Sequence, residues 1–385
     1  MKKFLFYFLL ANILFTLVGC NDNKISKNDL IEKSVSGESV PAYAYSYTIS
    51  NTPFYFENSI IHGVTNKNTN FINEDLTQVI ELKRGTNVEI TNTDLEGTFE
   101  VIYNEQKGSI NKSDLLYYTY NVTDDYSLVC DVSAFNHNRE YYTSGDFELY
   151  ILENDINYAI IRLGGRGYGK NGTMYYDKST SFFVEACEYL GVPYGFYFLD
   201  ESLNYSEVMN EVKFISNGLK QFNKLDFNLL PIFIDLEYQF GDGRADNIWN
   251  QRVPVLNLLI DSIKNELGID TIIYANGARI ETYIKDVNCN FWTAHYTLDN
   301  KIPVVFYKDF VRSEEQKDIN NSLLYKEVNR GGTDTFNYSE EYLNKVVGWQ
   351  FTENAASDNG IIGLLDLSLF DNTYISNYCI SKFYN

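Results

Sequence analysis

The sequence predicts an α/β protein, an irregular β/α barrel of the TIM type preceded by a smaller all-β module. After Tyr126, apolar runs of strand length alternate with amphipathic stretches of helical length in at least five units. This alternation requires right-handed crossovers and a parallel sheet. The strand-length runs are almost continuously apolar, which indicates a sheet covered on both faces. Five or more such units favour a closed or nearly closed barrel over a small open sheet.

The N-terminus has the layout of a secretory signal. Two lysines precede an apolar run from Phe4 to Val18, which is shorter than the roughly 20 apolar residues of a membrane-spanning helix. The run ends at Gly19-Cys20 and resembles the bacterial lipoprotein signal. The resemblance implies removal of residues 1–19, lipidation of Cys20, and a membrane-anchored protein of the cell envelope, outside the cytoplasm. An ordinary signal peptide with a chance cysteine is the alternative.

A tether and a small β module are expected before the barrel. Residues 20–47 are polar and lack periodicity, so we interpret them as the tether. From 48 to 122, short alternating runs separated by turn residues predict an all-β module. Its strands are expected within Leu82–Ile90, at Gly97–Tyr103 and within Lys107–Leu116. The order resembles bacterial Src-homology-3-like domains, and a role in wall binding and a role as a spacer both stay open.

The barrel is expected to span residues 126–385 and to begin with strands and helices in regular alternation. Its first six predicted strands are Leu128–Ser133, Tyr158–Leu163, Tyr194–Leu199, Leu230–Glu237, Thr271–Ala275 and Phe291–Tyr296. The predicted helices are Phe147–Asn154, Ser181–Leu190, Tyr205–Phe222, Trp249–Leu267 and Ala278–Ile284. Lys301–Val346 lacks clear periodicity and is expected to be an irregular excursion before a final strand pair, Val347–Thr352 and Ile362–Leu369. We expect the glycine-rich segment Gly164–Gly169 to be a mobile rim loop.

Charge and composition exclude several classes of function. The net charge of −21 argues against a nucleic-acid partner and against electrostatic steering onto an anionic cell wall. A polymer substrate must therefore be held by short-range contacts. The cysteines after Cys20 are irregularly spaced, and the three histidines are scattered, so the sequence predicts no metal, no other cofactor and no nucleophile–base pair. We expect Cys130 and Cys187 to be buried apolar side chains.

Two carboxylates, Asp235 and Glu237, end the apolar run Leu230–Glu237. A period of two places both side chains on one face of a strand, and the carboxyl ends of barrel strands carry the active site. Desolvation and mutual repulsion can separate their pKa values and keep one of them protonated. Cleavage of a glycosidic bond needs such a pair, an acid for the leaving oxygen and an anion near the oxocarbenium centre. A solvated turn beyond the strand is the alternative.

Two further acids, Asp131 near the end of the first barrel strand and Asp366 in the last strand, follow the same logic. Each alone is more typical of a helix or turn cap. Together with Asp235 and Glu237 they would place four carboxylates around one rim.

The segment Leu128–Phe370 resembles the family 25 glycoside hydrolases, a family of lysozymes. Several short motifs carry the resemblance by their shared order along the chain. They are Asp131-Val132-Ser133, Ala159–Gly164, Tyr176-Asp177, Gly191–Phe198, the pair Asp235 and Glu237, Trp292–Tyr296, Trp349–Thr352, Gly360-Ile361 and Leu365–Leu367. The resemblance implies an N-acetylmuramidase that acts on the glycan strands of peptidoglycan.

The family's roles are carried over onto the matching positions. The resemblance implies that Glu237 is the general acid and that Asp235 orients the substrate acetamido group or stabilises the charged intermediate. Asp131 and Asp366 would shape the field and hold the sugar, and Arg162 would pair with a rim carboxylate and lower its pKa. The residues expected to line the groove are Tyr197, Tyr274, Trp292, Tyr296 and Trp349. For each aromatic residue alone, core packing is the more typical role.

The sequence departs from the family in three places. The first loop, Phe135–Leu149, lacks the family's Gly-x-Ile-Asp-Trp stretch, Leu199–Ser202 is more acidic than expected, and the excursion after Lys301 is long. Two alternatives therefore stay open. One is a non-catalytic cell-wall-binding lipoprotein that retains the barrel, and the other is a hydrolase of another N-acetylated glycan such as chitin.

Overall fold

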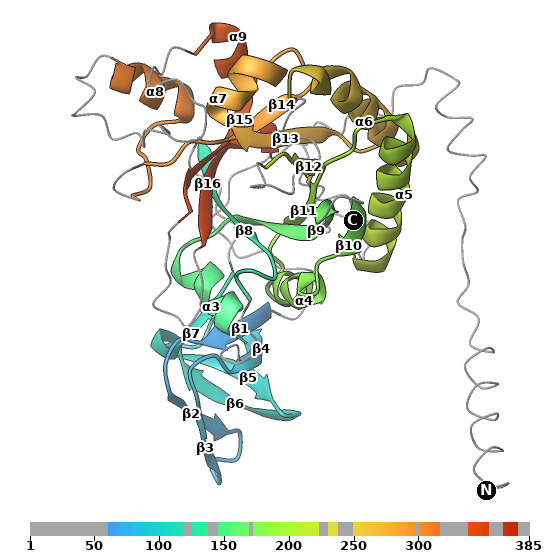
Figure 1. Cartoon of the computed structure of the whole chain (residues 1–385). Helices are drawn as coiled ribbons and strands as arrows, with labels where there is room; N and C mark the ends of the chain where they lie inside the picture. The colour runs from blue at the N-terminus through green and yellow to red at the C-terminus, as the bar shows by residue number, and fades with distance from the viewer. Residues whose placement is uncertain are drawn as a thin grey trace, which may run out of the picture. The chain divides into compact units, whose positions relative to one another are not determined.

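Figure 1 shows a computed structural model of the whole chain. The structure describes residues 61–118, 125–137, 145–168, 172–222, 230–237, 249–297, 301–315, 338–353 and 365–375. The predicted signal peptide, Cys20 and the tether lie outside these residues. Within the described ranges, no helix has both the length and the apolar character needed to cross a membrane.

The N-terminal module is a seven-stranded antiparallel sheet. Its strands are β1 (Ile61–Thr65), β2 (Thr69–Asn73), β3 (Val79–Leu82), β4 (Asn87–Asn92), β5 (Thr98–Tyr103), β6 (Gln106–Asn111) and β7 (Leu115–Tyr117), with a short 3-10 helix η1 at Lys112–Asp114. Their order in the sheet is β3-β2-β6-β5-β4-β1-β7. Alternate side chains such as Phe71, Val88 and Val101 are buried and form one small core. The predicted all-β module is therefore present, and its likeness to Src-homology-3 domains stays a prediction.

The second sheet closes into an eight-stranded barrel, which confirms the predicted fold class. Its strands are β8 (Tyr126–Val132), β9 (Tyr158–Tyr168), β11 (Tyr194–Leu199), β12 (Ile232–Asp235), β13 (Thr271–Asn276), β14 (Asn290–Ala294), β15 (Val346–Thr352) and β16 (Asp366–Asp371). Neighbours from β9 to β15 pair in parallel, and β8 pairs with β9 to close the ring. Strand β16 alone runs antiparallel, between β15 and β8.

Helices cover the outside of the barrel (Figure 1). They are α3 (Asp146–Glu153), α4 (Thr180–Leu190), α5 (Tyr205–Phe222), α6 (Arg252–Leu267) after the 3-10 turn η2 (Trp249–Gln251), and α7 (Gly277–Arg279), which continues into the π-helical turn η3 (Ile280–Ile284). These helices match the predicted ones to within a few residues. Gly191 ends α4 in the left-handed conformation, with φ of 77°, because glycine has no Cβ to clash there.

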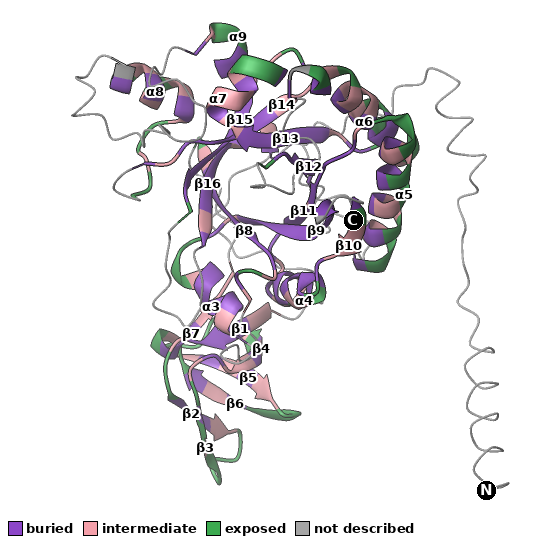
Figure 2. Cartoon of the chain, viewed as in Figure 1, coloured by how far each residue is buried: buried purple, intermediate pink, exposed green. Residues whose placement is uncertain are grey.

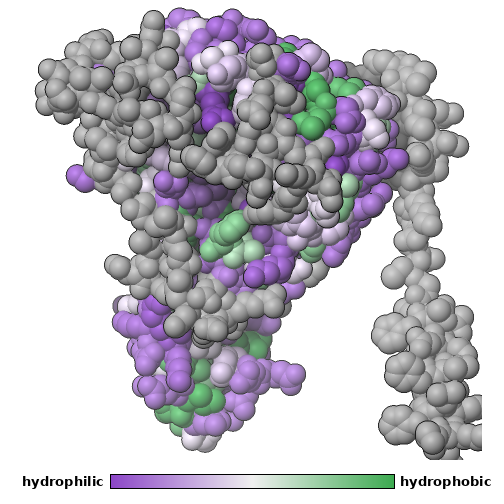
Figure 3. Space-filling model, in the orientation of Figure 1, coloured by the Kyte–Doolittle hydropathy of each residue, from purple (hydrophilic) through white to green (hydrophobic). Residues whose placement is uncertain are grey.

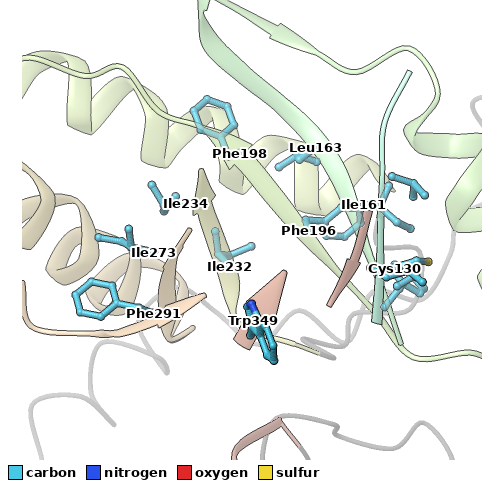
Figure 4. Packing of buried hydrophobic residues seen from close by; sticks show 14 of the residues in the cluster. Cys130, Ile161, Leu163, Phe196, Phe198, Ile232, Ile234, Ile273, Phe291 and Trp349 are labelled. Carbon is cyan, nitrogen blue, oxygen red and sulfur yellow. The ribbon is translucent and has the colours of Figure 1, made fainter. Parts of the chain in front are cut away.

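Two core layers follow from the alternation of side chains along the barrel strands. The outward side chains pack beneath the helices, as Figure 4 shows for Ile161, Phe196 and Ile234. The inward side chains, among them Tyr158, Phe233 and Trp292, fill the barrel interior. Figure 2 shows the same division, since the barrel strands are mostly buried while the outer faces of α5 and α6 are exposed. The barrel is therefore a packed core with no pore through it.

Two predictions about local structure are wrong. Gly164–Tyr168 is strand, because β9 continues through the glycines and pairs with the short strand β10 (Thr173–Tyr176). A Cβ on Gly164 would lie 2.0 Å from the carbonyl oxygen of Tyr175, so the glycine permits the close approach of the two strands. Lys301–Val346 is not wholly irregular, because it contains the helices α8 (Tyr307–Glu315) and α9 (Glu340–Leu343). A last helix, α10 (Asn372–Ile375), follows β16.

The surface and the cysteines agree with the composition. On the face shown in Figure 3, the described surface is mostly hydrophilic and its hydrophobic patches are small and separate. Cys130 and Cys187 are buried and free, as expected, and burial raises the pKa of both thiols. A buried thiol of raised pKa is a packing group and a poor nucleophile.

Candidate functional site

One end of the barrel collects a polar side chain from every strand. Because β8 to β15 are parallel, their carboxyl ends meet at this end, and antiparallel β16 begins there. The residues at this rim are Asp131, Arg162, Tyr197, Asp235, Glu237, Tyr274, Tyr296, Gln350 and Asp366. Each follows the inward-facing positions of its strand, so the polar rim lies on top of the apolar interior. We refer to Asp131, Asp235, Glu237 and Asp366 as the carboxyl cluster.

Asp131 and Asp366 form a pair of carboxyl groups across the antiparallel junction. They are direct partners in the register of β8 and β16, and their side chains are hydrogen-bonded to each other. Burial raises the pKa of Asp131 to about 7, and burial together with the neighbouring Asp131 charge raises the pKa of Asp366 well above its usual range. Two carboxylates so close cannot both ionise easily, so the charge of each opposes ionisation of the other.

Asp235 is the last residue of β12, and Glu237 lies two residues beyond the end of the strand, while Leu236 between them packs in the outer core. Asp235 is 4% exposed, and its Oδ1 accepts no hydrogen bond from the described residues. Burial, followed by the charge of Glu237, raises the pKa of Asp235 well above its usual range. Glu237 is exposed. The pair therefore combines one carboxyl group that is open to solvent with one that is buried and incompletely hydrogen-bonded.

Arg162 supplies the positive charge of the rim. Its side chain is buried, and its Nη2 donates a hydrogen bond of 2.6 Å to the hydroxyl of Tyr175. The guanidinium carbon lies 5.7 Å from the ring centre of Tyr197. The charge of Arg162 opposes the rise in the pKa of Asp235, so this arginine and the carboxyl cluster belong to one electrostatic unit.

Sequence reasoning missed Gln350, which connects three rim residues. Its Nε2 donates a hydrogen bond of 3.0 Å to Asp131 Oδ2, and its Oε1 accepts hydrogen bonds from the hydroxyls of Tyr274 at 2.7 Å and Tyr296 at 3.1 Å. Two of the tyrosines predicted to line a groove are thus held at the rim by one amide. The sequence could have indicated this role, because Gln350 is the only side-chain amide in the otherwise largely apolar run Val346–Thr352.

The two predicted tryptophan contacts are wrong. Trp349 precedes inward-facing Gln350 and belongs to the outer core, where it is fully buried against Tyr307 and Phe310 of α8. Trp292 does point inward, but it is 2% exposed and packs within the barrel interior, with its Nε1 donating to Ser368 Oγ at 2.9 Å. Neither indole can therefore contact a sugar at the rim.

One of the unusual acids after β11, Asp200, has a structural role. Asp200 forms a buried ion pair with Arg252, and its backbone N–H donates a hydrogen bond of 2.9 Å to the carbonyl oxygen of Asp235. Glu211 of α5 pairs with Arg166 of β9 in the same buried layer. These contacts attach the chain after β11 to the end of β12 and so hold the backbone of Asp235 in place.

The hollow found on the structure lies outside this rim, and the described residues offer no metal site. A hollow of about 700 Å³ lies at the opposite end of the barrel and is lined in part by Tyr126, Leu128 and Val304. It contains no member of the carboxyl cluster. Among the described residues, no group of three or more His, Cys, Asp or Glu side chains is arranged to hold a metal ion.

Comparison with known proteins found similarity to solved structures. No family model matches the chain, and no curated protein does. The catalytic domain of the endolysin Ply40 from bacteriophage P40 of Listeria monocytogenes is 17% identical, with a TM-score of 0.44, over 67% of this chain and 98% of that one. A family 25 glycosyl hydrolase from Bacillus anthracis is 17% identical, with a TM-score of 0.42, over 68% and 98%. The structural neighbours include family 25 glycoside hydrolases.

A third neighbour is the modular autolysin LytC from Streptococcus pneumoniae, in complex with a synthetic peptidoglycan ligand. It is 17% identical, with a TM-score of 0.44, over 73% of this chain, and the match spans 58% of LytC. Of these three neighbours, the protein from Bacillus anthracis is the one described as a family 25 glycosyl hydrolase.

Replacing Asp366 with asparagine should stabilise the protein at alkaline pH. The pKa of Asp366 is higher in the folded than in the unfolded chain, so its contribution to stability is present at low pH and is lost as the pH rises through the folded value. The amide of Asp366→Asn can donate to Asp131 at every pH. Thermal unfolding followed by circular dichroism should give a higher Tm than wild type at pH 8 and a similar Tm at pH 5. Asp371→Asn, at the other end of β16, is the control. An equal loss of Tm in Asp366→Asn at both pH values would contradict the raised pKa of Asp366.

Replacing Gln350 with glutamate should raise the pKa of Asp131 further. The new carboxylate can still accept the hydrogen bonds of Tyr274 and Tyr296, but it replaces the donor to Asp131 with a like charge. A carbon-13 NMR titration of the aspartate carboxyl groups would measure the change. Tyr296→Phe removes a bond on the other side of the amide and should leave Asp131 nearly unchanged. An unmoved Asp131 pKa in Gln350→Glu would show that Gln350 does not set it.

Proposed function

We propose that this protein is a peptidoglycan hydrolase that cleaves the β-1,4 bonds between N-acetylmuramic acid and N-acetylglucosamine. The observation that carries the proposal is the carboxyl cluster, in which exposed Glu237 stands two residues from buried Asp235 at the carboxyl end of a barrel strand. Hydrolysis of a glycosidic bond needs a proton donor and a second carboxyl group near the anomeric centre. The substrate class follows from the resemblance of the sequence to the family 25 lysozymes.

Glu237 is suited to the role of general acid. Its side chain is exposed, so a bound glycan can bring the leaving oxygen within hydrogen-bond distance of its carboxyl group. In the proposed reaction Glu237 protonates the glycosidic oxygen as the bond to the anomeric carbon breaks.

Asp235 is suited to bind the substrate close to that carbon. Its buried Oδ1 lacks a hydrogen-bond donor among the described residues, and a buried polar atom without a partner is costly. The N–H of a substrate acetamido group would supply the missing donor. In the charged form Asp235 would also stabilise the positive charge that develops on the sugar.

The other two acids of the carboxyl cluster and three tyrosines of the rim have supporting roles in the proposed reaction. Asp131 and Asp366 are hydrogen-bonded to each other and lie close enough to Glu237 for its charge to contribute to the raised pKa of each. We propose that this pair holds the sugar and keeps negative charge near the oxocarbenium centre. Tyr197, Tyr274 and Tyr296 pack against the barrel interior and would form the floor and walls beneath the sugar.

The activity can be tested on purified peptidoglycan. Glu237→Gln should lower the rate of hydrolysis by about 10²- to 10⁴-fold, because it removes the proton donor while the exposed position tolerates the amide. Asp235→Asn should also be severely impaired, and Glu266→Gln, an exposed glutamate of α6, is the matched control.

Analysis of the products decides between the alternatives. Products with a muramic acid reducing end would support a muramidase, whereas glucosamine reducing ends would reject it. A wild-type protein that binds peptidoglycan without cleaving it would favour the non-catalytic wall-binding lipoprotein. Cleavage of chitin in preference to peptidoglycan would identify a hydrolase of another N-acetylated glycan.

We also propose that the protein acts outside the cytoplasm, anchored to the membrane through lipidated Cys20, with residues 20–47 as the tether. The support is the Gly19-Cys20 junction after a short apolar run. Cys20→Ala should therefore leave the protein without lipid, as measured by mass spectrometry and by partition into detergent. Continued partition of Cys20→Ala with membranes would place the anchor elsewhere.

A further inference from the structure

Phe135 is an exposed aromatic residue in Ser133–His137, the described segment that follows β8 and Asp131. Its side chain is 74% exposed, although Ser133 and Asn136 on either side of it are buried. A single exposed apolar residue is ordinary on a protein surface, so exposure alone indicates no function. Phe135 differs from such residues in how its segment is held and in what lies beside its ring.

The loop is fixed by hydrogen bonds on both sides of Phe135. The Asn136 side chain accepts a bond of 2.8 Å from the Ser133 N–H, and the Ser133 hydroxyl accepts one of 3.2 Å from the Phe135 N–H. Asp177, before α4, accepts a bond of 3.1 Å from the Ala134 N–H. His137 then stacks on Phe182, with 4.2 Å between ring centres. The phenyl ring is therefore presented to solvent from a segment, Ser133–His137, whose backbone and flanking side chains are held by these contacts.

The Phe135 ring adjoins the carboxyl cluster through Arg162. The guanidinium carbon of Arg162 lies 5.6 Å from the ring centre of Phe135 and 5.6 Å from that of Tyr175. The charge of the same guanidinium acts on Asp235. One side of the phenyl ring thus contacts a buried cation of the site, while most of its remaining surface is open.

We propose that Phe135 is a stacking platform for a second sugar of the glycan, next to the sugar held by the carboxyl cluster. This inference rests on the proposed function. The C–H groups on one face of a pyranose ring carry partial positive charge and complement the negative face of an aromatic ring. An uncharged platform also suits a chain of net charge −21, which cannot attract an anionic wall polymer by its overall field.

The experiment measures binding without turnover. The parent is the full chain carrying Glu237→Gln, and the probe is the tetrasaccharide of alternating N-acetylglucosamine and N-acetylmuramic acid, titrated by calorimetry. Phe135→Ala and Phe135→Leu should each raise the Kd by about three- to tenfold, because both remove the ring and leucine keeps the apolar character. Phe135→Trp should retain the parent Kd. Val304→Ala, an exposed apolar residue at the opposite end of the barrel, is the control and should not change it.

The outcomes separate the two proposals. An unchanged Kd in Phe135→Ala would overturn the platform and leave the proposed function standing. If Phe135→Leu binds with the same Kd as the parent, the aromatic face does not bind the sugar, and the proposed platform is also overturned. If the parent does not bind the tetrasaccharide at all, the proposed function fails and the platform fails with it. Equal Tm values for the parent and the Phe135 variants would show that a change in Kd does not come from misfolding.

Discussion

The alternation of side chains along the strands of a closed barrel is the constraint on which the rest of this structure depends. Each strand places one set of side chains beneath the helices and the other set in the interior, so the two cores are built from adjacent residues such as Ile232 and Phe233. At the carboxyl ends of the parallel strands, the inward-facing side chain that follows the apolar interior positions lies at the rim. Asp131, Asp235 and Gln350 are therefore brought together by strand geometry, although they are far apart in the sequence.

This arrangement has an energetic consequence for the carboxyl cluster. Asp131 and Asp235 are buried and Asp366 is half-buried, and burial raises the pKa of all three. Charges held away from water near other charges destabilise a folded protein, and such groups collect where a protein binds or transforms a ligand. The cost is limited by one buried arginine, Arg162, and by the amide of Gln350. The surrounding apolar layers hold the acids in place.

Features that depend on local sequence could be predicted, and features that depend on strand pairing could not. Helices such as Tyr205–Phe222 and strands such as Tyr194–Leu199 were predicted within a residue, because periodicity and end signals are local. The sequence predicts a loop at Gly164–Gly169, whereas Gly164–Tyr168 is strand, because its pairing partner β10 is an edge strand of four residues. The inward register of β15 is set by its neighbouring strands, so local sequence does not show that Trp349 faces outward and Gln350 inward.

The amino-acid pattern is sufficient to predict the β/α barrel and the all-β module before it, because hydrophobic period and turn residues are encoded within a few residues. Which side chains meet depends on the folded chain. The hydrogen bond between Asp131 and Asp366, the bridge through Gln350, and the contact of Phe135 with Arg162 all join distant segments. The physical reason is that these contacts depend on the order and register of strands around the closed barrel, which no local pattern specifies.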